Sequence, residues 1–190
     1  MNICATPLEI EDVLLVETRR FQDLRGFFME TFHVEKYAEA GIVADFVQDN
    51  RSRSVHGALR GMHYQVNRPQ AKLVMALDGE IFDVAVDIRK GSPTFGKWCG
   101  AVLSGENGWQ MWVPEGFAHG FCVLSESADV LYKCTDLYSP GDERAILWSD
   151  PDMGIAWPLG KPLLSPKDAA APMLAELGED DLFRYGGKGV

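Results

Sequence analysis

The chain lacks the long apolar segments and the positive charge that would suit it to a membrane or a nucleic acid. No apolar run approaches the ~20 residues that cross a bilayer as a helix. Residues 1–13 carry acidic side chains but no basic region of a secretory signal. The formal net charge of −10 disfavours a polyanionic partner, although a local cluster of Arg and Lys can still bind a small anion. These absences predict a soluble, cytoplasmic protein with no membrane or nucleic-acid partner.

Cysteine is also sparse. The four cysteines form no C-x-x-C pair and have no metal-ligand spacing; they are Cys4, Cys99, Cys122 and Cys134. Cys122 and Cys134 lie in apolar runs, which is typical of buried free thiols and suits a reducing cytosol. The sequence therefore predicts no cysteine metal site.

What the chain does have is enough apolar content for one packed domain. Hydrophobic residues make up 46% of the 190 residues, which favours a globular core over a disordered chain. Because no linker or low-complexity segment interrupts the chain, a single domain is expected over 1–190. Its core is expected at about 8–175, followed by a tail at 176–190.

Turn-forming residues divide most of the chain into short segments with the character of β-strands, the pattern of a sandwich or barrel. Strands are expected at residues 13–18, 26–32, 46–53, 58–65, 71–77, 80–88, 98–103, 110–113, 118–124, 128–135 and 145–148. Segment 80–88 alternates, so that Phe82 and Val84 face one way while Asp83 and Asp87 face the other. The expected fold class is all-β, with short peripheral helices.

Two short helices are expected around the strands. Residues 34–40 form one, ended by Gly41. Near the C-terminus, Ser165 and Pro166 have the N-cap and first-turn chemistry of a helix start, and residues 169–177 are expected to continue as a helix. Residues 179–190 are expected to form a loose or partner-docked tail.

One stretch follows the first motif of metal-binding cupins, but with metal ligands replaced. Gly57 and Gly79 frame the motif, and His63 occupies the position of its first histidine. Gln65 replaces the second histidine, and Lys72 replaces the glutamate after a longer gap. Three histidines and a carboxylate bind a transition metal well, whereas two histidines, an amide and an ammonium do not. We therefore expect a cupin-type jelly-roll barrel that works without a metal.

A second stretch matches the other cupin motif. Gly108, Pro114 and Gly116 are followed by His119, at the position of the last ligand histidine. Two motifs in this order strengthen the expectation of a jelly-roll barrel.

Strand alternation is expected to gather side chains in one cavity, because the inward faces of barrel strands line one pocket. These side chains are His63, Lys72, His119 and Tyr132. Strict alternation directs Arg60 away from His63, so its place is left open. An imidazole is suited to general-base catalysis at neutral pH, a tyrosine can donate a proton, and an ammonium can stabilise an enolate. Together they suit proton abstraction next to a carbonyl, followed by reprotonation.

Structural roles are open for the same residues. His63 could be a hydrogen-bonded core or turn histidine, and Tyr132 an amphipathic core residue. Asp168 could be a first-turn acid that interacts favourably with the helix dipole. Arg51, Arg53 and Arg60 could belong to a solvated face. Composition and spacing do not decide between these roles and a catalytic one.

Several ordered motifs identify a family. They are Phe21-x-Asp23-x-Arg25-Gly26-Phe27-Phe28, Phe46-Val47-Gln48-Asp49-Asn50, Leu59-Arg60-Gly61-Met62-His63-Tyr64-Gln65, Val113-Pro114-Glu115-Gly116-Phe117-Ala118-His119-Gly120-Phe121, Tyr132-Lys133-Cys134-Thr135 with Tyr138-Ser139-Pro140, and Leu164-Ser165-Pro166-Lys167-Asp168. Over about residues 8–175 the chain resembles the dTDP-4-dehydrorhamnose 3,5-epimerase family of cofactor-free sugar-nucleotide epimerases. The resemblance implies a jelly-roll barrel, a homodimer and a dTDP-4-keto-6-deoxyhexose substrate, with no cofactor.

The resemblance also implies roles for individual residues. His63 matches the family's base, oriented by the carboxylate of Asp168. Tyr132 matches the acid, Lys72 the residue near the C4 oxygen, and Tyr138 the ring that stacks on thymine. The other matches are nucleotide and sugar contacts: Arg25, Glu30, Gln48, Asp49, Asn50, Arg60, His119, Glu143 and Lys167. The segment around Arg25 and Glu30 is implied to serve the neighbouring subunit's site.

The reaction implied is inversion of C3 and C5 in dTDP-4-keto-6-deoxy-D-glucose, which gives dTDP-4-keto-L-rhamnose. Enzymes that invert only C3 or only C5, for other deoxysugar or antibiotic pathways, share nearly all of these residues and are an alternative. More distant alternatives are a metal-dependent cupin oxygenase or isomerase and a cupin that binds sugar nucleotides without catalysis.

Overall fold

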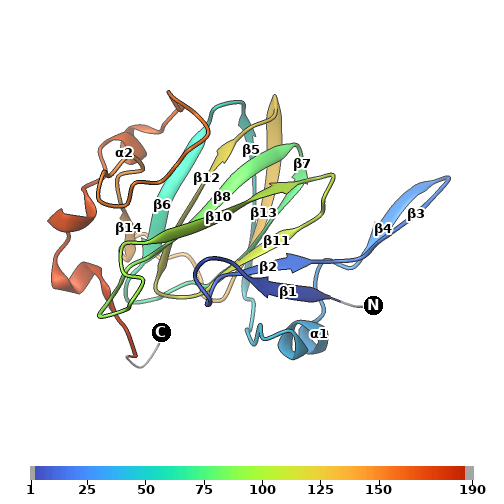
Figure 1. Cartoon of the computed structure of the whole chain (residues 1–190), viewed down its shortest axis with the longest axis horizontal. Helices are drawn as coiled ribbons and strands as arrows, with labels where there is room; N and C mark the ends of the chain where they lie inside the picture. Colours follow the sequence, from blue (N-terminus) through green and yellow to red (C-terminus); the bar gives the residue numbers. More distant parts are fainter. Residues whose placement is uncertain (1–2, 187–190) are drawn as a thin grey trace.

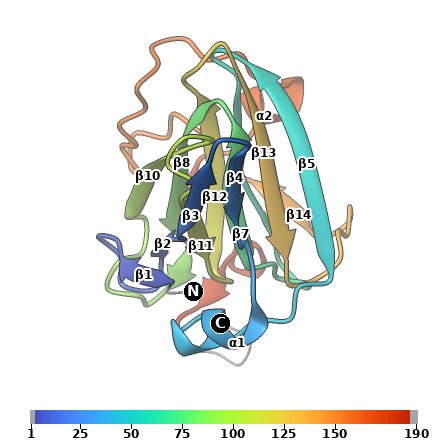
Figure 2. The ribbon, with the colours of Figure 1, turned by 90° about the vertical axis from the view of Figure 1, so that its right-hand side faces the viewer.

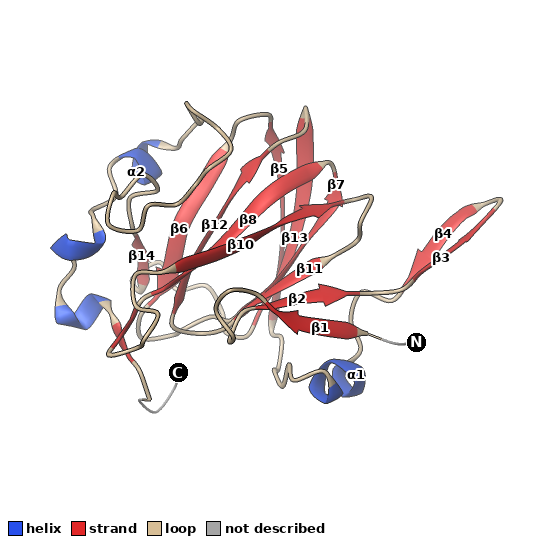
Figure 3. Ribbon diagram, viewed as in Figure 1, coloured by secondary structure: helices blue, strands red, loops and turns tan. Residues whose placement is uncertain are grey.

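The structure is a computed structural model that describes residues 3–186, and its strands form two antiparallel sheets packed face to face (Figures 1 and 3). One sheet runs in the order β1 (Cys4–Pro7), β2 (Leu14–Glu17), β11 (Gln110–Val113), β7 (Lys72–Asp78), β13 (Ser127–Cys134), β5 (Gln48–Val55). The other runs β10 (Trp98–Ser104), β8 (Glu80–Asp87), β12 (Phe117–Val123), β6 (Leu59–Gln65), β14 (Glu143–Ala145). The expected all-β jelly-roll class is confirmed.

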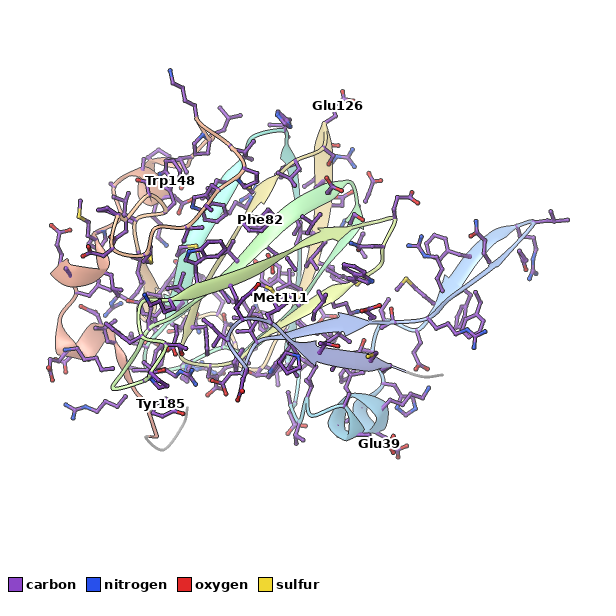
Figure 4. The ribbon with its side chains drawn as sticks, viewed as in Figure 1. Glu39, Phe82, Met111, Glu126, Trp148 and Tyr185 are labelled. Atoms are coloured by element: carbon purple, nitrogen blue, oxygen red, sulfur yellow. The ribbon has the colours of Figure 1, made fainter. Side chains whose placement is uncertain are left out.

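Apolar side chains from both sheets fill the space between them. Ile81 and Val123 of the five-stranded sheet pack in one cluster with Val74, Met111 and Val130 of the six-stranded sheet, and all five are fully buried. Figure 4 shows Met111 within the barrel. Burying a side chain of this kind stabilises a fold by ~1.5–3 kcal/mol relative to leaving it exposed.

The alternation of β8 separates two buried faces. Val84 and Val86 pack into a second apolar cluster, together with Leu174 and Phe183 from the C-terminal segment, which lies beside β6 and β14 in Figure 1. On the other face, the acidic residue Asp83 is fully buried. The alternation predicted the two faces correctly. The polar face is turned toward the interior of the barrel rather than toward solvent.

The expected strands from residue 46 to residue 135 form within two residues of their expected bounds. The strand expected at 145–148 is shifted, because β14 covers Glu143–Ala145. Beyond it the chain turns, and the Asp150 N–H donates to the Leu147 carbonyl at 3.1 Å. A turn at this point removes Leu147 from any strand pairing.

Helix α2 (Pro166–Ala169) begins where the capping residues predicted, and Ser165 Oγ accepts a hydrogen bond from the Asp168 N–H at 3.1 Å. The helix expected over 169–177 is wrong. The chain is irregular until a 3-10 turn, η1 (Leu174–Glu176). Pro172 explains the break, because proline lacks an N–H and disfavours the helical conformation of the residue before it.

The C-terminal tail packs on the barrel. A 3-10 turn, η2 (Glu179–Asp181), leads to β15 (Phe183–Arg184), which pairs in parallel with β9 (Arg89–Lys90). The expectation of a loose or partner-docked tail is thus corrected for residues 179–186, and residues 187–190 lie outside the described part. The physical reason is apolar burial, because the ring of Phe183 joins the second apolar cluster.

A hairpin that was not expected extends from the barrel. Its strands, β3 (Arg20–Asp23) and β4 (Gly26–Met29), pair antiparallel and point away from both sheets (Figures 1 and 2). Leu24 at its tip is fully exposed, and Phe28 is 63% exposed. The expected strand 26–32 is therefore shortened to β4, whereas helix α1 (Val34–Glu39) forms as expected. This hairpin lacks the cover that the other strands have. Because an isolated two-stranded hairpin is only marginally stable in water, its stability within a single subunit is expected to be low.

A buried ion pair holds the end of β8. The carboxylate of Asp87 accepts hydrogen bonds from Arg89 Nε at 2.9 Å and from Ser92 Oγ at 2.5 Å. Burial raises the pKa of Asp87, but the hydrogen bonds from Arg89, Ser92 and Thr94 lower it more, so the pKa lies below its ordinary value. The pair therefore stabilises the fold fully above the ordinary aspartate pKa of about 3.9, and this stability is lost as the pH falls through the folded-state pKa.

Replacing Asp87 by Asn is expected to lower the free energy of unfolding at neutral pH by about 3 kcal/mol, because Arg89 loses its buried charge partner. Asp12→Asn removes the half-exposed partner of the same Arg89 and is expected to cost less than about 1 kcal/mol. Urea unfolding at neutral and acidic pH measures both. The deficit of the Asp87 variant should shrink in acid, and an equal deficit at both pH values would contradict the ionic explanation.

Candidate active site

His63 and Asp168 meet although they are far apart in the chain. His63 lies on β6, α2 packs against this strand, and His63 Nε2 lies 2.6 Å from Asp168 Oδ1. The carboxylate is 5% exposed and the imidazole 29% exposed. The pair thus has a buried acceptor and a ring that is accessible from the interior of the barrel.

The carboxylate of Asp168 orients the ring. Burial raises the pKa of Asp168, but the hydrogen bond and charge of His63, with hydrogen bonds from Ser165 and the Gly61 backbone, lower it more. Asp168 is therefore ionised at neutral pH. When the ring of His63 is neutral, the hydrogen bond to this carboxylate holds its proton on Nε2, which leaves the Nδ1 lone pair free to accept a proton.

A β-bulge in β6 brings Arg60 to the side of His63. In the antiparallel pairing with β12, His63 lies opposite His119 and Arg60 lies opposite Phe121. Between these two pairs, β6 therefore covers a step of three residues while β12 covers a step of two. The extra residue reverses the alternation. Arg60 therefore lines the same cleft as His63, and its Nε donates to Ser54 Oγ at 2.9 Å. Strict alternation was wrong at this position.

Gly61 permits the close approach of the two strands at this bulge. Its φ of 121° is in the region that favours glycine. A Cβ at Gly61 would lie 2.6 Å from Gly120 Cα and 2.7 Å from the carbonyl oxygen of His119. The backbone of β12 cannot yield to such a contact, so no side chain fits at residue 61.

Lys72 reaches the same place from the opposite sheet. It is 8% exposed, and its Nζ donates to the His63 carbonyl at 3.5 Å. Burial lowers the pKa of Lys72, and the nearby Cys134, Asp83 and Glu143 offset only part of this effect. The long contact with the His63 carbonyl uses only one of the N–H donors of Lys72. Another can donate a hydrogen bond to an oxygen in the cleft.

His119 forms a second histidine–carboxylate pair, with a partner that the sequence analysis missed. Its Nε2 lies 2.9 Å from Asp83 Oδ1. Burial lowers the pKa of His119 more than Asp83 raises it, so the ring is neutral at neutral pH. The alternation of β8 had placed Asp83 on the polar face, which was the only available signal.

Tyr132 lines the cleft from β13. Burial raises the pKa of its hydroxyl, Cys134 adds to this effect, and the charge of Arg60 opposes it. The hydroxyl therefore keeps its proton at neutral pH, so it can donate a hydrogen bond or a proton into the cleft.

Two adjoining cavities, of about 300 and 270 Å³, open on these side chains. His63, Lys72, Tyr132 and Glu143 line both, so the two form one cleft. The first is also lined by Gln48, Asn50, Tyr64, Gln65, Gln70 and Tyr138. The second is also lined by Ser52, Arg60, His119, Phe121, Ser165, Lys167 and Asp168. Some lining residues were not among the expected site residues. Tyr64, Phe121 and Ser165 lie within the family motifs, whereas no motif marked Ser52 or Gln70.

Glu143 connects the two ends of the cleft. Its carboxylate accepts hydrogen bonds from the Tyr138 hydroxyl at 2.7 Å and from Lys167 Nζ at 2.5 Å. Gln48 Oε1 accepts from the Tyr138 N–H at 2.8 Å. The half-exposed ring of Tyr138 can stack against a nucleobase. The ammonium of Lys167, on the other side of Glu143, can bind a phosphate.

Three expected contacts are not brought to this cleft. Arg25 lies on the hairpin and bonds only to Asp23 among the described residues. Glu30 pairs with Lys36 at 2.6 Å. Asp49 pairs with Lys133 at 2.8 Å and does not line either cavity. Within one subunit these residues are therefore separate from the cleft.

No group of three or more His, Cys, Asp or Glu side chains in residues 3–186 is arranged to hold a metal ion. No helix in this part of the chain is long and apolar enough to cross a membrane.

Comparison with known proteins agrees with the fold. The sequence profile described as dTDP-4-dehydrorhamnose 3,5-epimerase matches residues 7–176. A protein of that name from Neisseria gonorrhoeae is 53% identical over 186 residues, which are 97% of this chain. The chain spans 56% of the length of that relative. A dTDP-4-dehydrorhamnose 3-epimerase from Streptomyces niveus is 42% identical over 179 residues, which cover 93% of this chain and 86% of the relative.

Among solved structures, the dTDP-6-deoxy-D-glucose-3,5-epimerase of Legionella pneumophila Philadelphia 1, in complex with dTDP-4-keto-L-rhamnose, superposes with a TM-score of 0.95. It is 52% identical and the match covers 98% of this chain and 100% of that one. With a profile match over residues 7–176 and similarity to relatives along nearly its whole length, the chain belongs to the dTDP-4-dehydrorhamnose 3,5-epimerase family.

Proposed function

We propose that this protein is an epimerase that inverts C3 and C5 of dTDP-4-keto-6-deoxy-D-glucose, giving dTDP-4-keto-L-rhamnose. The observation that carries the proposal is the oriented His63–Asp168 pair, 2.6 Å apart, in a cleft shared with Lys72 and Tyr132. Membership of the family supports the substrate class.

The chemistry follows from the C4 ketone, which acidifies the protons on C3 and C5. His63 removes one of these protons through Nδ1, and the Asp168 carboxylate stabilises the imidazolium that forms. Lys72 donates a hydrogen bond to the enolate oxygen at C4. Tyr132 then protonates the carbon from the opposite face, which inverts it. His63 then releases its proton to solvent and Tyr132 regains one, so that the second carbon can undergo the same sequence after the sugar shifts or flips.

Proton NMR of dTDP-4-keto-6-deoxy-D-glucose with the protein in deuterium oxide tests the proposal. Deuterium is expected at both C3 and C5, with formation of the L-sugar. Absence of exchange at both carbons would refute epimerisation and favour a cupin that only binds sugar nucleotides.

A second candidate is epimerisation at C3 alone, because a relative named as a 3-epimerase is similar to this chain over nearly its whole length. The same experiment separates the two reactions. Deuterium and inversion at C3 only would establish the second candidate.

We propose further that the active form is a homodimer in which the hairpin β3–β4 brings Arg25, with Glu30 near its base, to the neighbouring cleft. The exposed Leu24 and Phe28 support this, because a partner surface would cover them. Replacing Phe28 by Ser is expected to give a monomer with weaker substrate binding, measured by sedimentation and calorimetry. Val43→Ser, at an exposed apolar position between α1 and β5, should change neither.

We also propose that catalysis needs no metal or cofactor and occurs in the cytosol. Gln65 and Lys72 at two cupin ligand positions support metal independence. Gln65 Nε2 donates to the carbonyls of Arg68 and Leu137, so its amide already has a structural role. Full turnover by protein treated with a chelator, with elemental analysis of the same sample, checks this.

Tyr138→Ala is expected to weaken dTDP binding by about 1–3 kcal/mol, or roughly 5- to 150-fold, because stacking on the thymine is lost. Tyr138→Phe keeps the ring but removes the hydrogen bond to Glu143, and should retain most of the affinity. Titration calorimetry with dTDP measures both variants. Equal affinity in wild type and Tyr138→Ala would remove Tyr138 from the nucleotide site.

A further inference from the structure

The chain beyond residue 176, where the family match ends, packs behind the strand that carries His63. Tyr64 follows His63 on β6, and alternation turns its ring to the opposite face of the sheet. There the centroid of the Phe183 ring lies 6.1 Å from that of the Tyr64 ring, and the angle between the ring planes is 61°. Met62, on the other side of His63, is buried in the same apolar cluster. His63 is thus held from behind by both of its neighbours.

The same tail also fixes the edge strand beside β6. Strand β14 has only three residues, and its central residue, Arg144, is paired with Tyr64. Arg144 Nε donates to Asp181 Oδ1 at 2.6 Å. A short strand at a sheet edge opens easily unless it is covered. Asp181 provides this cover on β14, next to Glu143 of the cleft.

These contacts form one group. Burial raises the pKa of Tyr64, and the carboxylate of Asp181 adds to this effect while Arg144 opposes it, as expected if the hydroxyl lies near both. The tail itself is anchored at a separate place, because β15 pairs with β9. Figure 1 shows this segment running along the side of β14 and β6, and Figure 4 shows Tyr185 at its end.

We propose that Asp181 and Phe183 are positioning residues, which hold β14 and β6 from behind so that His63 stays aligned with Asp168 and the cleft. The kinetic part of this inference rests on the proposed function. A displacement of about 1 Å at a reacting group can lower a rate about 100-fold without unfolding the protein. Loosened support should therefore appear in kcat before it appears in the fold.

The test uses full-length Asp181→Asn, Phe183→Ala and the double variant. Glu179→Gln is the matched control, because it removes a carboxylate from the same tail. Among the described residues, this carboxylate bonds only to Lys90 and Arg184. We expect kcat to fall about tenfold or more in the double variant, with KM changed less than threefold, while Glu179→Gln behaves as wild type. Phe183→Leu, which keeps an apolar side chain, should restore most of the activity of Phe183→Ala.

A second readout does not depend on turnover. The proton shared by His63 Nε2 and Asp168 is expected to give a downfield NMR signal in wild type and Glu179→Gln, and to broaden or vanish in the double variant. Circular dichroism and thermal unfolding show whether each variant is folded. If the double variant unfolds, Asp181→Asn alone still tests the inference, because it changes only the partly exposed pair between Asp181 and Arg144. Unchanged kcat and an unchanged signal in folded variants would overturn the inference. An inactive wild type with the expected signals would instead contradict the proposed function alone.

Discussion

Replacing His63 by Asn is expected to lower kcat for epimerisation by about 10²–10⁴-fold, because the general base is lost. Asn can still donate a hydrogen bond to Asp168, so the carboxylate is not left unpaired in the interior. Binding of dTDP should change little, since His63 is assigned to the sugar carbons rather than to the nucleotide. Turnover by NMR and dTDP affinity by calorimetry measure the two effects.

The control for this variant is His56→Asn. His56 is exposed, and its Nδ1 lies 3.0 Å from the carbonyl oxygen of Leu124, away from the cleft. Its replacement should leave turnover unchanged. If the His63 variant kept more than a tenth of wild-type turnover while binding dTDP normally, another residue would have to act as the base.

Replacing Tyr132 by Phe is expected to reduce inversion by about 10²–10⁴-fold, while exchange of substrate protons with solvent continues. The ring remains, so its packing in the barrel is preserved, and only the proton donor is removed. Because His63 still forms the enolate, protonation returns mainly to the original face. NMR in deuterium oxide measures deuterium uptake and inversion in the same sample.

Tyr185→Phe removes a hydroxyl from a ring that lines neither cavity, where the Arg89 guanidinium lies over the Tyr185 ring, and should leave both rates unchanged. Loss of exchange in parallel with inversion in the Tyr132 variant would count against an acid role. It would indicate that this hydroxyl helps to form the enolate.

The local features of the fold could be predicted because they depend on short-range chemistry. Ser165 and Pro166 specify the start of α2, and alternation in β8 specifies its two faces. The continuation of α2 to residue 177 was wrong because a helical composition did not outweigh Pro172. The tail was expected to be loose or docked on a partner, whereas Phe183 is buried in a cluster formed by segments distant in the chain.

Arg60 shows where sequence reasoning about the site reached its limit. Its cleft position depends on an extra residue in β6, and a bulge is visible only in the register between two strands. The hairpin β3–β4 is similar, because nothing in its sequence states that it leaves the barrel.

The sequence by itself determined the strands between residues 46 and 135, the two cupin motifs and the types of side chain available for acid–base chemistry. Only the tertiary structure decided that His63 bonds to Asp168, that Asp83 pairs with His119, and that Arg60 joins the cleft. The physical reason is that strand periods and caps are set by neighbouring residues. Distances across sheets depend on register, twist and the packing of segments distant in the chain.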